Sequence, residues 1–105
     1  MSTRLLNMIT VTCIEWGLIE MESKRYAAAS CLFKIWTVIE PDEMHSWLNL
    51  ARSYAFMADI KQCLPSLREA MKHGLKTKQR ILNDEAFRSM KNEKLFKEML
   101  DKLQQ

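Results

Sequence analysis

Residues that break helices are scarce in this chain, which has two glycines and two prolines among its 105 residues. Sheets built from hairpins need such residues at their turns, whereas long stretches rich in Leu, Met, Ala, Lys and Glu favour helix. Apolar residues also recur at three- to four-residue spacing, the period of an amphipathic helix. The sequence therefore predicts an all-α protein.

The breakers and caps divide the first part of the chain into helices. One long helix is expected from about residue 3 to residue 22, and Ser23 is a candidate cap for the second. Pro41 ends that second helix. The acidic pair Asp42 and Glu43 then suits the first turn of a third helix, which runs to about residue 57.

The fourth predicted helix begins at a cap, Asp59, and ends at Gly74. Pro65 lies inside it and lacks the amide donor that a helix interior needs. We expect this proline to kink the helix or to displace its beginning. Beyond Gly74 the apolar period weakens, and two shorter helices separated near Asn92 are expected.

Two segments spaced by about 34 residues carry complementary halves of one helical pattern. The first-helix half is present at Trp47, Leu50, Ala51 and Tyr54, and the second-helix half at Ala29, Phe33 and Pro41. The pattern resembles the tetratricopeptide repeat (TPR). It implies antiparallel helical hairpins stacked as an α-α superhelix in a single domain, residues 1–105. The repeats would be about residues 10–43 and 44–77, with a closing cap at 78–105.

The resemblance has departures, and a generic helical bundle stays open as an alternative. Glu20 replaces an aromatic residue of the first repeat, Trp36 replaces a small residue, and Cys63 and Pro65 interrupt the second repeat. The segment from Asn83 to Leu100 resembles the tail that closes many TPR arrays. The shared core predicted on this basis contains Trp16, Ala29, Phe33, Trp47, Leu50, Tyr54 and Leu67.

The cysteines and the apolar content indicate the class of protein. Hydrophobic residues make up 48% of the chain and charged residues 28%, a balance typical of folded globular proteins. Cys13, Cys31 and Cys63 are odd in number and widely spaced, so buried reduced thiols are expected rather than disulfides or zinc ligands. No stretch is long and apolar enough to span a bilayer. We therefore expect a soluble cytoplasmic protein.

No arrangement of residues predicts catalysis. His45 and His73 lie outside any metal-ligand motif, and Gly17 and Gly74 stand alone rather than in a phosphate-binding loop. We therefore expect a protein that is not an enzyme and that uses no cofactor or metal. Residues 68–105 carry ten Lys or Arg against six Asp or Glu, and a basic stretch from Arg68 to Arg80 leaves nucleic-acid binding as a minor alternative.

TPR proteins hold other polypeptides on the concave side, which is lined by the first helix of each repeat. The resemblance places there Ile14, Leu18, Met21, His45, Leu48, Asn49, Arg52 and Phe56. Carboxylate-clamp members of the family use Lys and Asn on the first helix; Ile14 and Leu18 stand in those places here, so clamp function is not expected. The mainly apolar stripe suits an amphipathic helix of a partner, with Arg52 orienting it through an acidic group.

Three hypotheses of function follow. The first is an adaptor or small chaperone for an apolar helical segment, similar in architecture to the small chaperones of type III secretion. The second is a self-associating dimer or a structural piece of a larger assembly. The third is a nucleic-acid-associated regulator that uses the basic region. The apolar stripe also has a structural alternative, since Leu5, Met8 or the carboxy-terminal helix of the same chain can cover it.

Overall fold

Helices make up 77% of the structure, a computed structural model that describes residues 3–103. No strand is present within that range, which confirms the all-α prediction. The helices are α1 (Thr3–Glu22), α2 (Tyr26–Ile39), α3 (Met44–Phe56), α4 (Ile60–Lys72), α5 (Lys78–Leu82), the 3-10 helix η1 (Glu85–Met90) and α6 (Lys94–Leu100).

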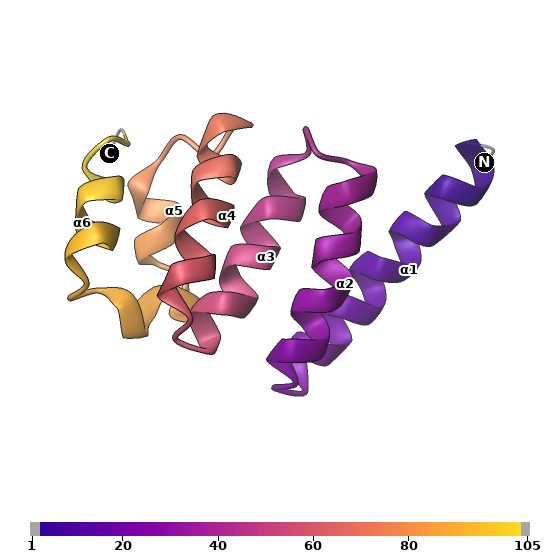
Figure 1. The fold of residues 1–105 in the computed structure, drawn as a ribbon, viewed down its shortest axis with the longest axis horizontal. Coiled ribbons are helices and arrows are strands. Elements are labelled where there is room, and N and C mark those ends of the chain that lie inside the picture. The colour runs from indigo at the N-terminus through magenta and orange to yellow at the C-terminus, as the bar shows by residue number, and fades with distance from the viewer. Residues whose placement is uncertain (1–2, 104–105) are drawn as a thin grey trace.

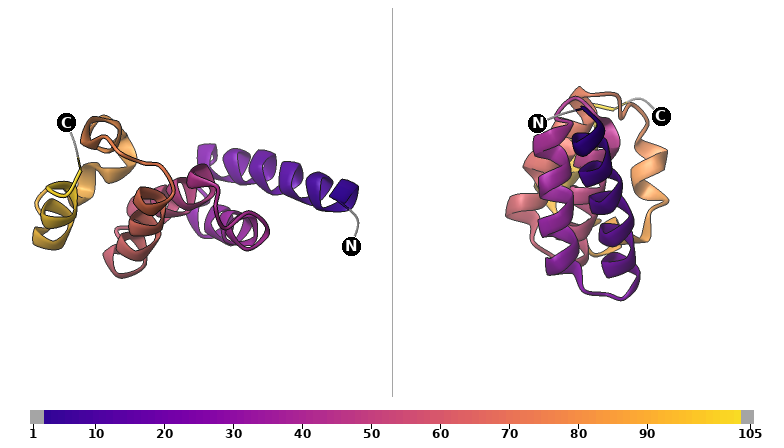
Figure 2. Two further views of the ribbon diagram at one scale, coloured as in Figure 1. Left: turned by 90° about the horizontal axis from the view of Figure 1, so that it is seen from above. Right: turned by 90° about the vertical axis from the view of Figure 1, so that its right-hand side faces the viewer.

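The helices follow one another along the longest dimension of a molecule that measures 42 × 27 × 21 Å (Figure 1). α1 and α2 form one antiparallel hairpin, α3 and α4 form a second, and α2 packs against α3 to join them. Seen from above, α1 and α5 lie toward one side and α2, α4 and α6 toward the other, with α3 between (Figure 2). No helix of residues 3–103 has both the length and the apolarity needed to cross a membrane.

Side-chain caps set the beginning of several helices. The Glu43 carboxylate accepts a hydrogen bond from the amide of His45 at 3.0 Å, and the Asp59 carboxylate accepts one from the amide of Gln62 at 3.3 Å. The predicted cap at Asp59 is thus confirmed. α4 begins directly after it, so Pro65 does not displace the start of the helix. The kink at Pro65 stays a prediction.

The predicted cap at Ser23 is wrong, because Ser23 belongs to the turn that closes α1. The amide of Arg25 donates to the carbonyl of Glu20 at 2.8 Å, and the amide of Lys24 donates to that of Met21 at 3.0 Å. Lys24 adopts a left-handed conformation (φ 64°) between them, the arrangement of a Schellman motif. α2 then begins at Tyr26 with no side-chain cap.

The core runs between the hairpins, with Phe33, Ala51 and Leu67 fully buried. Ala29, Leu50 and Tyr54 are buried as predicted, whereas Trp16 is 54% exposed and Trp47 is only half-buried. Trp16 points outward because its neighbour Gly17 is the residue of α1 that faces Phe33. The Trp47 indole instead donates to the carbonyl of Pro41 at 2.7 Å.

The remaining corrections concern Cys31 and the carboxy-terminal part. Cys31 is exposed, because it lies on the outward face of α2, whereas Cys13 and Cys63 are buried as expected. Three elements, α5, η1 and α6, stand where two short helices were predicted. The additional element is η1, which Asp84 starts by accepting a hydrogen bond from the amide of Ala86 at 3.0 Å. The break near Asn92 is confirmed by the turn between η1 and α6.

Candidate protein-binding surfaces

A depression of about 370 Å³ lies where the carboxy-terminal end of α1 meets α3. We call it the α1–α3 depression; its lining residues are Leu18, Met21, Glu22, Lys24, Tyr26, Arg52, Phe56 and Glu85. Four of the eight residues predicted for partner binding therefore come together: Leu18, Met21, Arg52 and Phe56. The other four lie elsewhere on α1 and α3.

The apolar part of this depression is built from α1, α2 and α3 together. The rings of Tyr26 and Phe56 stack with their centroids 4.6 Å apart and their planes 7° apart. Leu18 is 44% exposed beside them, whereas Met21 is mostly buried. Glu22, Lys24 and Glu85 carry charges of both signs among the lining residues. This combination of apolar side chains and charges is typical of a surface that binds an amphipathic segment.

Arg52, expected to orient a ligand, already faces an acidic residue of its own chain. Its Nε lies 2.8 Å from Oδ2 of Asp84, and its Nη1 donates to Oδ1 of Asn49 at 2.9 Å. The contact with Asp84 is an ion pair rather than an aligned hydrogen bond, because the Nε–H is not directed at an acceptor among the described residues. The Arg52–Asp84 ion pair therefore links the start of η1 to α3, and Asn49 holds Arg52 by a hydrogen bond within α3.

Residues of α5 and η1 also contact α3 at other points along its length. His45 Nε2 lies 3.0 Å from Nη2 of Arg80, and its Nδ1 lies 3.1 Å from the Glu43 carboxylate. Ser89 donates to the carbonyl of Ala55 at 3.3 Å. α5 and η1 thus contact α3 at His45 and Ala55, but His45 stays exposed and Asn49 half-buried, so α3 is only partly covered there, and Leu18 of α1 stays exposed.

The prediction that Leu48 binds a partner is wrong, because its side chain is only 6% exposed and belongs to the core. α3 packs against α2, α4 and η1, which leaves little of its surface open. Ile14 is half-buried and packs on the same core. Leu48 therefore offers a partner no free surface, and Ile14 offers only part of the surface that the sequence pattern predicted.

A second and larger groove, of about 760 Å³, lies on α2, α3 and α4. We call it the α2–α4 groove; its lining includes Lys34, Val38, Trp47, Lys61 and Pro65. Val38 is 77% exposed there. The sequence pattern does not reveal this site, although it singles out Trp47 as a core residue and Pro65 as a helix breaker. Their proximity could not be read from spacing, because it depends on how α2 and α4 lie against α3.

The titratable groups with shifted pKa values have structural causes. Burial raises the pKa of the Cys13 thiol, and burial together with the charge of Asp59 raises that of Cys63 to about 12. Such shifts disfavour the reactive thiolate at neutral pH. The guanidinium of Arg25 hydrogen-bonds to Glu20 and holds the pKa of that carboxyl below its ordinary value.

Metal ligands are not clustered within residues 3–103, where no group of three or more His, Cys, Asp and Glu side chains could hold an ion. Comparison with known protein families, with curated proteins and with solved structures finds no match for this chain.

Proposed function

We propose that this protein is a non-enzymatic interaction module of TPR type that binds an amphipathic helix of a protein partner. One observation carries the proposal. A row of apolar residues on α1, at Val11, Ile14 and Leu18, continues into the α1–α3 depression at Met21 and Phe56. Val11 and Leu18 are 51% and 44% exposed, far more than residues of a packed helix face.

The spacing of this row fits a helical ligand. The residues of α1 follow one another at three- and four-residue steps, which is the spacing at which an amphipathic helix presents its apolar anchors. Glu22, Lys24 and Glu85 then offer charges of both signs to polar residues of the ligand. Arg52 is not counted among these charges, because it forms an ion pair with Asp84 of its own chain. An adaptor and a small chaperone that shields an apolar helix of its client would both use this site.

The test begins with capture of the partner from the native cell, followed by titration of its purified helical segment. Leu18→Asp should weaken binding at least roughly tenfold, because a buried apolar contact of that size contributes more than about 1.4 kcal/mol. Leu95→Asp is the matched control, since Leu95 is 60% exposed on α6, far from the depression. Circular dichroism should show unchanged helix content in both variants.

Two results would contradict the proposal. Binding that survives Leu18→Asp would move the site elsewhere, and Val38→Asp would then test the α2–α4 groove. Loss of helix content in the Leu18→Asp variant would show that the residue belongs to the core rather than to a binding surface.

A further inference from the structure

A second apolar surface lies on the opposite side of α1 from the core. It consists of Met8, Ile9, Thr12, Trp16 and Ile19, which we call the outer row. Ile9, Thr12, Trp16 and Ile19 are spaced three, four and three residues apart, the repeat with which two helices pack along a seam. The four large side chains are 61%, 37%, 54% and 56% exposed in chain order. The outer row is thus separate from the row that contains Leu18.

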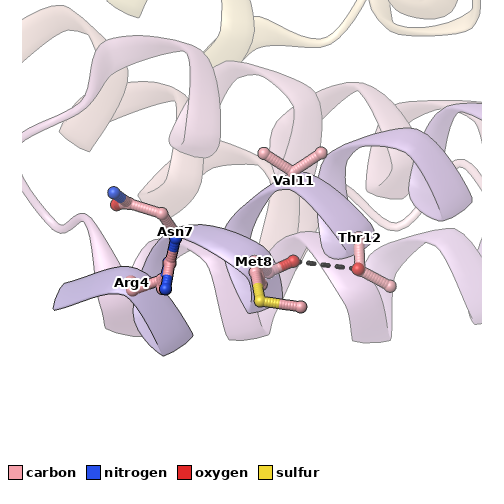
Figure 3. Close-up of a pocket in the computed structure, with 5 residues that line it drawn as sticks. All are labelled: Arg4, Asn7, Met8, Val11 and Thr12. Atoms are coloured by element: carbon pink, nitrogen blue, oxygen red, sulfur yellow. Dashed lines mark hydrogen bonds between the residues drawn. The ribbon is translucent and has the colours of Figure 1, made fainter. Parts of the chain in front are cut away.

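Thr12 adds to the apolar character of this row. Its hydroxyl donates to the carbonyl of Met8 at 2.9 Å, one turn back along the helix, so its hydrogen bond is made within α1 (Figure 3). Beside it, Arg4, Asn7, Met8 and Val11 line a hollow on the helix surface.

The charges of α1 are placed opposite to what a single helix prefers. Arg4 lies in the first turn and Glu22 in the last, although the helix dipole favours acidic residues at the beginning and basic ones at the end. The two residues lie about five full turns apart and therefore on one line along the helix, and Glu15 lies close to the same line. None of these three side chains has an ionic partner within the described residues.

We propose that the outer row of α1 packs antiparallel against the outer row of α1 in a second copy of this chain. In a twofold pair centred between residues 12 and 13, Ile9 of one copy lies level with Trp16 of the other. The same flank of each helix meets in such a pair, so Arg4 of each copy lies beside Glu22 of the other. Unfavourable charges within one helix thus become complementary between two.

The area is sufficient for a stable pair. The four large side chains of the outer row expose on the order of 400 Å² per copy, given the size of large apolar side chains. Two copies together with their charged flanks then pass the roughly 1,000 Å² that a specific interface needs. This inference goes beyond the proposed function, because the outer row is a different face of α1 and its partner is a second copy of the chain; Glu22 lies at the edge of both surfaces.

Sedimentation equilibrium on the full chain at about 10–100 μM tests the pair. The wild-type protein should sediment at twice its mass of 12.4 kDa. Ile19→Arg should give the monomer with unchanged helix content, because the side chain is exposed in the single copy. Val38→Arg is the matched control, since Val38 is exposed on α2 outside the outer row, and it should remain a dimer.

Charge exchange tests the antiparallel orientation. Arg4→Glu should weaken association by roughly tenfold, because it places two acidic residues together at both ends of the pair. Adding Glu22→Arg should restore association, which a parallel arrangement cannot do. A wild-type monomer at the highest concentration, a dimer that persists in Ile19→Arg, or a failure of the double exchange to restore association would each overturn the inference. Leu18→Asp should leave the dimer intact, which separates this result from the test of the proposed function.

Discussion

Gly17 of α1 lies directly against the ring of Phe33 on α2. A Cβ atom at Gly17 would lie 2.5 Å from Cε1 of Phe33, closer than two carbon atoms approach without a clash. Phe33 is fully buried and has no open space to move into. The absence of a side chain at Gly17 therefore allows the first hairpin to close.

Gly17→Ala should lower the free energy of unfolding by about 1–3 kcal/mol, the usual effect of overpacking, even though alanine favours helix. Urea denaturation measures it. In a Phe33→Leu background the same change should have a smaller effect, because the ring atoms that clash are absent. If Gly17→Ala stabilises the protein, the two helices do not meet in this register.

Ala58 has a left-handed backbone conformation that glycine adopts without strain. Its φ is 55°, in the turn that closes α3, where the amide of Asp59 donates to the carbonyl of Tyr54 at 2.9 Å. Ala58→Gly should raise the free energy of unfolding by about 1 kcal/mol, because the Cβ clash is removed. Ala28→Gly, on the exposed face of α2, is the control and should lower stability by roughly 0.5–1 kcal/mol. Equal effects of the two changes would contradict the assigned turn.

Asp84 should stabilise the carboxy-terminal part through its charge on Arg52. Asp84→Asn keeps a good cap for η1 but removes that charge, so we expect a loss of about 0.5–1 kcal/mol that shrinks as salt is added. Asp101→Asn is the control, because its pair with Lys78 is 3.9 Å long and Asp101 is 78% exposed. Thermal melts at low and high ionic strength should separate the two variants.

The three thiols should differ in reactivity toward an alkylating reagent at pH 8. Cys31 is exposed and should react first, whereas Cys63 is fully buried with a pKa raised to about 12 and should react only on unfolding. Mass spectrometry of digested protein identifies the modified residue. Cys31→Ser should abolish the fast reaction. Modification of native Cys63 at the rate of Cys31 would show that the interface around α4 opens readily.

Glu20 should make stability depend on pH in the acid range. The hydrogen bond from Arg25, and to a lesser degree that from the Trp16 indole, lowers the pKa of Glu20 below its ordinary value of 4.5. The folded state therefore binds this proton less tightly than the unfolded chain. The stabilisation is complete above about pH 4.5 and disappears as the pH falls through the lowered pKa.

Glu20→Gln should lower stability at pH 7 and flatten its decline below about pH 4.5. Glu15→Gln, on the exposed side of the same helix, serves as the control. Denaturant titrations between pH 2.5 and pH 7, at roughly half-unit steps, give the profile. A decline of unchanged steepness in the Glu20→Gln variant would assign the acid sensitivity to other carboxyl groups.

Local patterns were sufficient to place most of the helices. The apolar spacing of residues 3–22 predicted α1, and the Asp59 cap predicted the start of α4. The cap predicted at Ser23 was wrong because a Schellman turn normally has glycine at its left-handed position, whereas here Lys24 occupies that position. The weak period after Gly74 hid the separate element η1, which depends on the cap at Asp84.

For the candidate site, spacing identified which residues share a face of one helix but not what lies opposite that face. Leu18 and Phe56 were predicted and do line the α1–α3 depression. Leu48 was predicted on the same grounds and is buried. Arg52 was expected to meet a ligand and instead meets Asp84, which lies 32 residues later in the chain.

The sequence by itself determined that this protein is helical, because helix formation depends on contacts between residues three and four apart. Only the tertiary structure decided which apolar stripe became core and which stayed at the surface. α1 is apolar on several sides, and its helical period alone does not rank them. Phe33 packs against Gly17 and so fixes which side of α1 faces the core. Leu18 then lines the α1–α3 depression, and Trp16 faces outward.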